Sequence, residues 1–262
     1  MFANKNLLLT RNHYPLVYVA LDKTQNENLA LAKMLCEQLP DGSYGFKINI
    51  DSVLDFSEEA LSPRKYLDQL ASLKKPIFLD LKLHNGPGPM MKLAAKVKNL
   101  VDVIDMHASA GKEFIQKVSE ILKGGKAKLF AVTLLTHDKI ENVEKSLEVM
   151  IKLANDAVSG GADGLIMPPT MLKEMRKRYP TIPIITPGIR PEWFQDKKIN
   201  HQQEISTPTE AMRDGATALV IGSPICLSNN PVDALTMILD ELALNRDLTC
   251  HSISANRQIN IT

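Results

Sequence analysis

The sequence predicts an α/β protein of the (β/α)8 TIM-barrel class, folded as a single domain. Short apolar segments alternate with longer segments of helical periodicity, and eight such pairs follow one another along the chain. The apolar segments are almost continuous in hydrophobic residues, which is typical of parallel strands buried on both faces. An α/β barrel typically has about 250 residues in one domain, and this chain has 262 residues.

The expected strands are short and rich in apolar or β-branched residues, whereas the segments between them have apolar residues at helical spacing. The expected strands cover residues 16–21, 44–50, 76–83, 101–108, 127–136, 163–168, 181–189 and 216–223. The expected helices cover residues 24–39, 62–73, 89–100, 112–122, 141–160, 170–179, 207–215 and 231–244.

Several of the expected helices have recognisable ends. Thr24 or Asn26 could cap the first helix, and Pro63 suits the first turn of the second. The pair Gly160 and Gly161 would end the sixth helix. Strict alternation of strand and helix implies parallel strands joined by right-handed crossovers. An open doubly wound sheet is the alternative architecture, but no GxGxxG motif follows the first strand.

Composition limits the domain organisation and the partners. We expect the barrel to cover residues 1–245 and a polar, loosely attached tail to cover residues 246–262. The net charge of +1 gives no reason to expect nucleic acid or an anionic membrane as partner. The apolar run near the N-terminus is too short for a signal peptide or a membrane span. Cys36, Cys226 and Cys250 form no CxxC pair, which fits free thiols in a reducing cytoplasm.

Polar residues recur at the ends of the expected strands, where barrels carry their catalytic groups. Asp80 and Lys82 are the most informative pair, because residues two apart on a strand share a face. Both would point into the barrel mouth, where an unpaired charge is costly. A structural ion pair is one interpretation, and a protonated lysine held ready to deliver a proton is the other. Further candidates at strand ends are Asp22, Lys47, His107, Thr136 and His137.

Two turns that contain glycine follow the seventh and eighth expected strands. They are TPGIR at residues 186–190 and VIGSP at residues 220–224. Barrels often bind phosphate in this region through backbone N–H groups and a helix N-terminus. Arg190 could add a bidentate contact to the anion. The candidate phosphate-binding residues are therefore Pro187, Arg190, Gly222 and Ser223.

Seven stretches along the chain match a known pattern in order and spacing. They are VALD (19–22), FLDLKLHN (78–85), MHASAG (106–111), AVTLLT (131–136), TPGIRP (186–191), TPTEA (207–211) and VIGSPI (220–225). Together they resemble the orotidine 5′-monophosphate decarboxylase family, and its bacterial form most. The resemblance implies a cytoplasmic lyase of pyrimidine biosynthesis with no metal or organic cofactor. It also implies a homodimer whose subunits share their active sites.

The resemblance also implies roles for individual residues. Asp22 is similar to the aspartate that binds a ribose hydroxyl, and Lys47 to the lysine between the ribose and the first carboxylate. Asp80 resembles the carboxylate that faces the substrate carboxylate. Lys82 resembles the proton donor to the vinyl carbanion that remains when CO2 departs. The residues similar to those that face the base or bind the phosphate are Thr136, Arg190, Gln202 and Gly222.

The chain departs from the family pattern around the expected ligand. Asn85 stands where the motif Asp-x-Lys-x-x-Asp has its last aspartate, which in the family comes from the partner subunit and completes a Lys–Asp–Lys–Asp array. An amide keeps the size of that residue and loses its charge. The other departures are Pro89 for a threonine, His137 for a serine, Glu204 for an arginine, and Ser223 for an arginine that binds phosphate.

Three functions therefore remain open at the level of the sequence. The first is the decarboxylation of orotidine 5′-phosphate to uridine 5′-phosphate, with Lys82 as proton donor. The second is a carbanion or enolate reaction on a different nucleotide or nucleoside. The third is an inactive barrel that binds a nucleotide. The 3-keto-gulonate phosphate decarboxylase branch is a poorer match, because Lys47 stands where that branch has a magnesium-binding glutamate.

Overall fold

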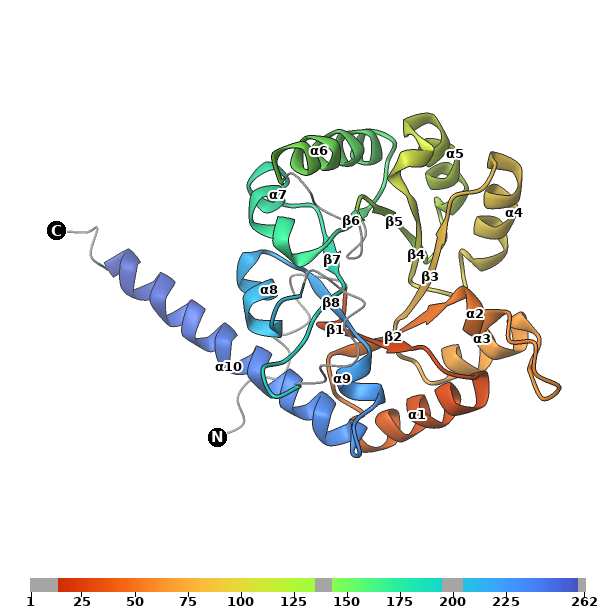
Figure 1. Cartoon of the computed structure of the whole chain (residues 1–262), viewed down its shortest axis with the longest axis horizontal. Coiled ribbons are helices and arrows are strands. Elements are labelled where there is room, and N and C mark those ends of the chain that lie inside the picture. Colours follow the sequence, from red (N-terminus) through yellow and green to blue (C-terminus); the bar gives the residue numbers. More distant parts are fainter. Residues whose placement is uncertain (1–13, 135–142, 195–204, 259–262) are drawn as a thin grey trace.

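The computed structural model describes residues 14–134, 143–194 and 205–258, which form a closed barrel of parallel strands surrounded by helices (Figure 1). Neighbouring strands pair in sequence order, and the last strand closes the barrel by pairing with the first. The predicted (β/α)8 barrel is confirmed, and the open sheet is excluded. The strands are β1 (Val17–Leu21), β2 (Tyr44–Asn49), β3 (Ile77–Leu83), β4 (Val103–His107), β5 (Lys128–Val132), β6 (Gly164–Ile166), β7 (Ile184–Thr186) and β8 (Ala218–Ile221).

Each strand is followed by a helix of the outer ring. These helices are α1 (Gln25–Gln38), α3 (Pro63–Ser72), α4 (Pro87–Val97), α5 (Lys112–Leu122), α6 (Val143–Ser159), α7 (Leu172–Arg178), α8 (Pro208–Asp214) and α10 (Pro231–Gln258). Four one-turn helices were not predicted, because a single turn has no apolar periodicity. They are α2 (Ile50–Val53), η2 (Ala108–Ala110), η3 (Pro169–Met171) and α9 (Ser223–Cys226). In the part of the chain described here, no helix has the length and apolar character needed to cross a membrane.

Local sequence explains where several helices begin. Thr24, not Asn26, caps α1: its side chain accepts the backbone N–H of Glu27, and the Glu27 side chain accepts the backbone N–H of Thr24. This reciprocal capping satisfies two backbone donors that a helix start leaves free. Ser62 caps α3, and Pro63 occupies its first turn as predicted.

Helix α10 is longer than the sequence predicts. Its apolar pattern predicts a helix over residues 231–244 and an irregular tail from residue 246, whereas the backbone is helical to Gln258. The extension is polar, so apolar periodicity could not reveal it. The domain boundary at residue 245 stays a prediction.

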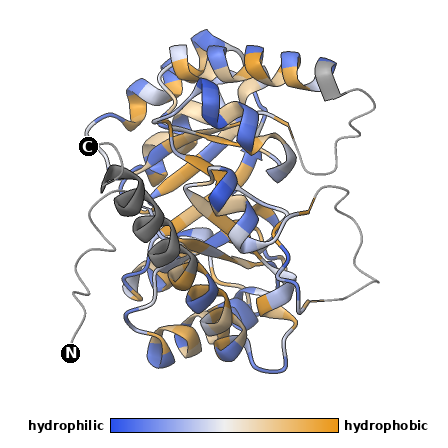
Figure 2. Ribbon diagram, turned by 90° about the vertical axis from the view of Figure 1, so that its left-hand side faces the viewer, coloured by the Kyte–Doolittle hydropathy of each residue, from blue (hydrophilic) through white to orange (hydrophobic). Residues whose placement is uncertain are grey.

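The hydrophobic core has two parts. The larger part lies between the outside of the barrel and the helices. The smaller part fills the barrel interior and consists of Tyr18, Phe78, Val103, Phe130, Val132, Ile166, Ile185 and Ala218. Figure 2 shows the strands largely in hydrophobic colours and the surrounding helices in alternating ones. Side chains at positions i and i+2 of a strand share a face. A residue two positions after one of these interior residues therefore points into the barrel opening at the carboxyl ends of the strands.

Candidate active site

A cavity of about 280 Å³ lies at the carboxyl ends of the strands. Among its lining residues are eight that the sequence predicts as site residues, namely Asp22, Lys47, Asp80, Lys82, Pro187, Arg190, Gly222 and Ser223. The remaining lining residues are Ala20, Phe78, Asp105, Leu134, Ile166, Gly188, Ile189, Val220 and Pro224. The structure thus brings together in one cavity residues that are up to about 200 positions apart in sequence, because a closed barrel gathers all its strand ends.

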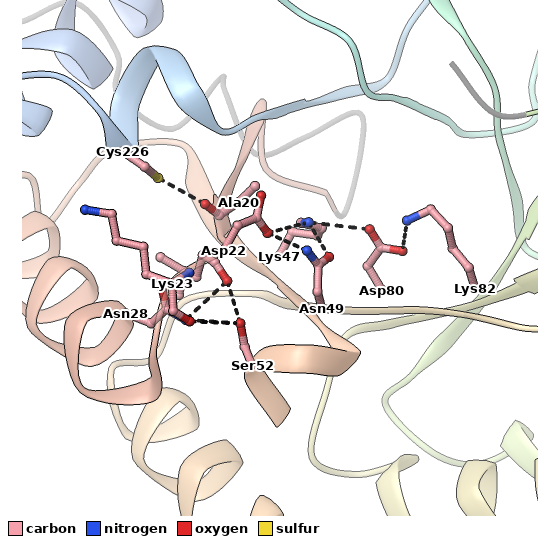
Figure 3. A network of polar contacts seen from close by, with 11 residues as sticks. Ala20, Asp22, Lys23, Asn28, Lys47, Asn49, Ser52, Asp80, Lys82 and Cys226 are labelled. Atoms are coloured by element: carbon pink, nitrogen blue, oxygen red, sulfur yellow. Dashed lines mark hydrogen bonds and ion pairs between the residues drawn. The ribbon is translucent and has the colours of Figure 1, made fainter. Parts of the chain in front are cut away.

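Four charged side chains of alternating sign form a continuous array on one side of the cavity (Figure 3). Lys47 Nζ lies 2.9 Å from Asp22 Oδ1 and 3.6 Å from Asp80 Oδ2. Lys82 Nζ donates a hydrogen bond to the other oxygen of Asp80. The order along the array is therefore Asp22, Lys47, Asp80 and Lys82, and each charge has an opposite charge beside it.

The array is partly removed from water. The side chains of Lys47 and Asp80 are 7% and 8% exposed, whereas that of Lys82 is 39% exposed at the cavity. Burial raises the pKa of Asp80, but the charges of Lys47 and Lys82, together with hydrogen bonds to the carboxylate, lower it by more, so the net direction is below the ordinary aspartate value. Asp80 is therefore ionised at neutral pH.

Buried side chains of two neighbouring helices hydrogen-bond to the backbone of the loop after β1. Asn28 Nδ2 of α1 donates to the carbonyl oxygens of Leu21 and Lys23, at 3.2 and 2.8 Å. Ser52 Oγ of α2 donates to the carbonyl oxygen of Leu21 at 3.0 Å. These bonds fix the backbone on both sides of Asp22, whose carboxylate then meets Lys47.

Asn49 is a member of the site that the sequence reasoning missed. Its Nδ2 donates to Asp22 Oδ1 at 2.6 Å, and its Oδ1 accepts a hydrogen bond from Lys47 Nζ. Asn49 lies two residues after Lys47 at the end of β2, so both side chains share a face. The same spacing rule that singles out Asp80 and Lys82 could have found this pair.

Asp105 of β4 is a second residue that was missed. It lines the cavity floor but is fully buried, with 0% of its surface exposed. Its Oδ1 accepts the backbone N–H groups of Leu81 and Lys82, both at 2.8 Å. A carboxylate between Ile104 and Met106, in the middle of an expected buried strand, is a sequence signal that could have pointed to this residue.

Lys82 has an unusual backbone conformation for a strand residue. Its φ of 45° lies in the left-handed region, which costs a residue other than glycine about 1–2 kcal/mol. The pairing of β3 with β4 is irregular here, because Leu79 pairs with Ile104 and Leu83 pairs with Met106. Three residues of β3 therefore face one residue of β4. The bulge changes the direction in which Lys82 projects.

The predicted phosphate-binding residues line the same cavity, in the segments that follow β7 and β8. The turn at Gly188 is held to residue 206 by backbone hydrogen bonds, with Arg190 N donating to Ser206 O at 2.9 Å. Gly222 directly follows β8 and lies close to β1, so that a Cβ at this position would lie 3.3 Å from Ala20 Cβ. Ser223 follows as the first residue of α9. The guanidinium carbon of Arg190 lies 5.3 Å from the centre of the Phe194 ring.

Cys226 lies near Asp22 but is not placed as a reactive thiol. Its Sγ donates to the carbonyl oxygen of Ala20 at 3.0 Å. Burial, followed by the charge of Asp22, raises the pKa of this thiol to about 12. Cys226 is therefore protonated at neutral pH, when the thiolate needed for nucleophilic chemistry is scarce.

Asn85 does not line this cavity. It lies in the exposed loop between β3 and α4, where its Oδ1 accepts the backbone N–H of Gly86 at 2.8 Å. Pro89 is also exposed. His107 ends β4, with its ring centre 5.7 Å from that of His84. Four further residues that the sequence singles out lie outside the described residues: Thr136, His137, Gln202 and Glu204.

Comparison with known proteins places this arrangement in one family. The sequence of an orotidine 5′-phosphate decarboxylase from Geobacter sulfurreducens is 36% identical over 179 residues, which is 63% of this chain and 74% of that protein. That of Prochlorococcus marinus is 36% identical over 192 residues, which is 67% of this chain and 79% of that protein.

The fold comparison agrees with the sequence comparison. The crystal structure of orotidine 5′-phosphate decarboxylase from Lactobacillus acidophilus superposes with a TM-score of 0.68 and 27% identity, over 87% of this chain and 98% of that one. The profile of the family described as "Orotidine 5′-phosphate decarboxylase / HUMPS family" matches residues 15–238, which is most of the chain. The chain therefore belongs to the orotidine 5′-phosphate decarboxylase / HUMPS family.

Proposed function

We propose that this protein decarboxylates orotidine 5′-phosphate to uridine 5′-phosphate and that no metal or organic cofactor takes part. The observation that carries the proposal is the array of Asp22, Lys47, Asp80 and Lys82 at one cavity. An array of fixed charges can stabilise charge that develops in a transition state without reorganising solvent. The family relationship supplies the substrate class, a phosphorylated nucleoside.

The chemistry follows from the positions of Asp80 and Lys82. In the proposed reaction the bond between C6 of the pyrimidine and its carboxylate breaks, CO2 leaves, and the electron pair stays on C6. Asp80 is ionised and would face the substrate carboxylate, so that repulsion is relieved as CO2 departs. Lys82 Nζ–H then gives its proton to C6, and the amine recovers a proton from solvent. The ion pair with Asp80 would hold the Lys82 ammonium in place for this transfer.

The other site residues would bind the ribose and the phosphate. Asp22 and Lys47 would hydrogen-bond ribose hydroxyls, and Asn49 contacts both of them and would orient them. Backbone N–H groups near Gly188 and Gly222, together with Arg190 and Ser223, would meet the phosphate. Pro187 borders the same end of the cavity. Thr136 and Gln202 are further proposed ligands on the basis of the resemblance alone, and His137 is proposed as a ligand in place of the serine of the family pattern.

The direct test is to mix the purified protein at high concentration with orotidine 5′-phosphate and follow the loss of substrate absorbance. We expect turnover, and a loss of about 10²–10⁴-fold in the Lys82→Ala variant, because a positioned proton donor contributes that much. Lys117→Ala is the matched control, since Lys117 is an exposed lysine of α5. Absence of turnover above the Lys82→Ala background would refute the proposed reaction.

A second candidate function is the same chemistry on a different nucleotide or an uncharged nucleoside. Ser223 favours it, because this residue borders the cavity where the family pattern has an arginine that binds phosphate. Thermal unfolding with ligands separates the cases, since a ligand stabilises the protein according to its affinity. Equal stabilisation by uridine and uridine 5′-phosphate would favour an uncharged substrate. Stabilisation by uridine 5′-phosphate without any turnover would favour a binding protein.

We also propose that the protein is a cytoplasmic homodimer with shared active sites. Asn85 supports this, because it is exposed and does not line the cavity of its own chain. In a shared site it would instead reach the cavity of the partner. Ile50, Leu54 and Phe56 are exposed apolar side chains that line a second cavity. Asp22 lines both this cavity and the one that holds the charged array.

A further inference from the structure

Asp105 is a buried titratable residue that the proposed reaction uses neither for proton transfer nor for binding the ribose or the phosphate. It lies within β4, and none of its surface is exposed. Its neighbours along the strand, Ile104 and Met106, are buried apolar residues. Burying an ionised carboxylate without a cation beside it is very costly, so such a group is either neutral or bound by donors. The contacts of its two oxygens distinguish these cases.

The first oxygen of Asp105 holds the bulge of β3. Oδ1 accepts the backbone N–H groups of Leu81 and Lys82, both at 2.8 Å. These two residues lie within the irregular part of the β3–β4 pairing, between Leu79 and Leu83. A bulge leaves such N–H groups without a ladder acceptor, and Asp105 Oδ1 takes the place of that acceptor.

The same contact fixes the residue that would deliver the proton. Lys82 has the left-handed φ of 45°, a conformation that persists in residues other than glycine only when the surroundings enforce it. The hydrogen bond from its own N–H to Asp105 is a direct constraint on this conformation. Because the backbone sets the direction of the side chain, Asp105 helps to determine where the Lys82 ammonium lies relative to Asp80.

The second oxygen of Asp105, Oδ2, is buried. Within the described residues, Oδ2 has no N–H or O–H donor as partner. The carboxyl group of Asp80 acts on it, because, after burial, both the charge of Asp80 and a hydrogen bond between the two carboxyl groups raise the pKa of Asp105. Two carboxyl groups can share a hydrogen bond only when one of them carries a proton.

The charges around Asp105 decide which carboxyl group holds that proton. Burial first, and then the negative charge of Asp80, raise the pKa of Asp105 well above the ordinary aspartate value, while Lys82 acts in the opposite direction. Asp80 has its pKa lowered by Lys47 and Lys82 despite its burial. On the other side of β4, the residue paired with Asp105 is the apolar Phe130.

We propose that Asp105 is a positioning residue that acts as a neutral carboxylic acid. Its Oδ1 fixes the backbone of Lys82, and its Oδ2–H donates to Asp80, so that the carboxylate and the ammonium are held in one geometry. The consequence for turnover rests on the proposed function. The arrangement itself is a property of the free protein and can be measured without substrate.

The protonation of Asp105 is measured by nuclear magnetic resonance on protein labelled with ¹³C at the aspartate carboxyl carbons. The Asp105 resonance is identified by its loss in the Asp105→Asn variant. We expect the chemical shift of a protonated carboxyl group at pH 7. The chemical shift of an ionised carboxylate at pH 7 would overturn the proposal. The only variant that must fold for this measurement is Asp105→Asn, which is used for the assignment.

The position of Lys82 is followed in the same way with ¹³C at the lysine Cε. Asparagine keeps an acceptor for the two N–H groups and an N–H donor toward Asp80, so Asp105→Asn should leave the Lys82 resonance in place. Asp105→Ala removes both contacts and should move it. Asp102→Asn is the matched control, because Asp102 accepts the backbone N–H of Ile77 in β3 but lies outside the array. An unmoved resonance in Asp105→Ala would contradict the proposal.

Turnover of orotidine 5′-phosphate gives a separate readout. We expect Asp105→Asn to stay within about threefold of wild type and Asp105→Ala to lose about 100-fold in kcat with little change in KM, which is the size of effect that a misplaced reacting group produces. Equal losses in the two variants would overturn the positioning role. If the wild-type protein shows no turnover, the proposed reaction fails, and the two resonance measurements still decide the role of Asp105.

Discussion

Ser223 is the residue at which the cavity departs most clearly from a phosphate site. It stands at the first position of α9, next to Gly222, with a neutral side chain. An arginine there would add a charge-assisted hydrogen bond worth about 1.5–3 kcal/mol. We predict that Ser223→Arg lowers KM for orotidine 5′-phosphate by about 10- to 150-fold with kcat little changed. Steady-state kinetics checks this.

The control for this prediction separates charge from size. Ser223→Gln introduces a long polar side chain without charge and should leave KM close to the wild-type value. A similar fall in KM for both variants, or no fall for Ser223→Arg, would mean that residue 223 does not meet the phosphate.

The raised pKa of Asp105 has a consequence for stability. In the folded protein Asp105 keeps its proton at pH values where the unfolded chain has lost it, that is, above the ordinary aspartate pKa of about 4. The unfolded state is then favoured progressively as pH rises, by about 1.4 kcal/mol per pH unit in this window. Asparagine cannot ionise, so this loss is absent from Asp105→Asn.

We therefore predict that the free energy of unfolding of Asp105→Asn, relative to wild type, increases as pH rises from about 4 toward neutrality. Urea denaturation of both proteins at several pH values measures it. A difference that is independent of pH, or that shrinks as pH rises, would show that Asp105 is ionised in the folded protein.

At the residue scale, the site was predictable where one strand supplies two polar side chains. Asp80 and Lys82 are two positions apart in an apolar run, and the structure confirms that they pair. Asn49 was missed although its spacing from Lys47 is the same. The left-handed backbone of Lys82 could not be predicted from the sequence, because it arises from the irregular pairing of β3 with β4 and from Asp105.

At the scale of the elements, β6 and β5 pack against each other through a glycine. A Cβ on Gly164 would lie 2.2 Å from Cε1 of the Phe130 ring, which is far inside contact distance. The ring is fully buried in the barrel interior and cannot move aside easily. We predict that Gly164→Ala lowers the free energy of unfolding by about 1–3 kcal/mol, measured by urea denaturation.

Gly88→Ala is the matched control for this substitution. Gly88 lies in the first turn of α4, and a Cβ there would meet no atom within 4 Å. This variant should unfold at or above the wild-type denaturant concentration, because alanine favours the helix. A Gly164→Ala protein as stable as Gly88→Ala would contradict the packing of the barrel interior.

The strands and long helices were predictable because each carries a periodic apolar pattern that agrees with its place in the barrel. The expected strands 127–136 and 181–189 were too long, since β5 is Lys128–Val132 and β7 is Ile184–Thr186. In each case the described residues directly after the observed strand lie at the mouth of the barrel. The sequence pattern counts them as part of the strand, although they lie beyond the paired residues of the sheet. The helical extension of α10 to Gln258 was missed for the opposite reason, because it lacks an apolar pattern.

At the scale of the whole molecule, the proposed sharing of active sites requires a dimer. Asn85 is exposed on the loop between β3 and α4, so within one chain its amide does not complete the charged array. We predict that light scattering at the protein concentration of the activity assay gives twice the chain mass of 29.1 kDa. A mass of one chain under conditions of full activity would exclude a shared site.

The central claim is that the array at the carboxyl ends of the strands removes CO2 from orotidine 5′-phosphate. The most direct measurement is the release of ¹⁴CO2 from carboxyl-labelled orotidine 5′-phosphate by wild type, Lys82→Ala and Lys117→Ala. We predict release by wild type and Lys117→Ala in step with formation of uridine 5′-phosphate, and about 10²–10⁴-fold slower release by Lys82→Ala. Wild-type release no faster than that of Lys82→Ala would contradict it.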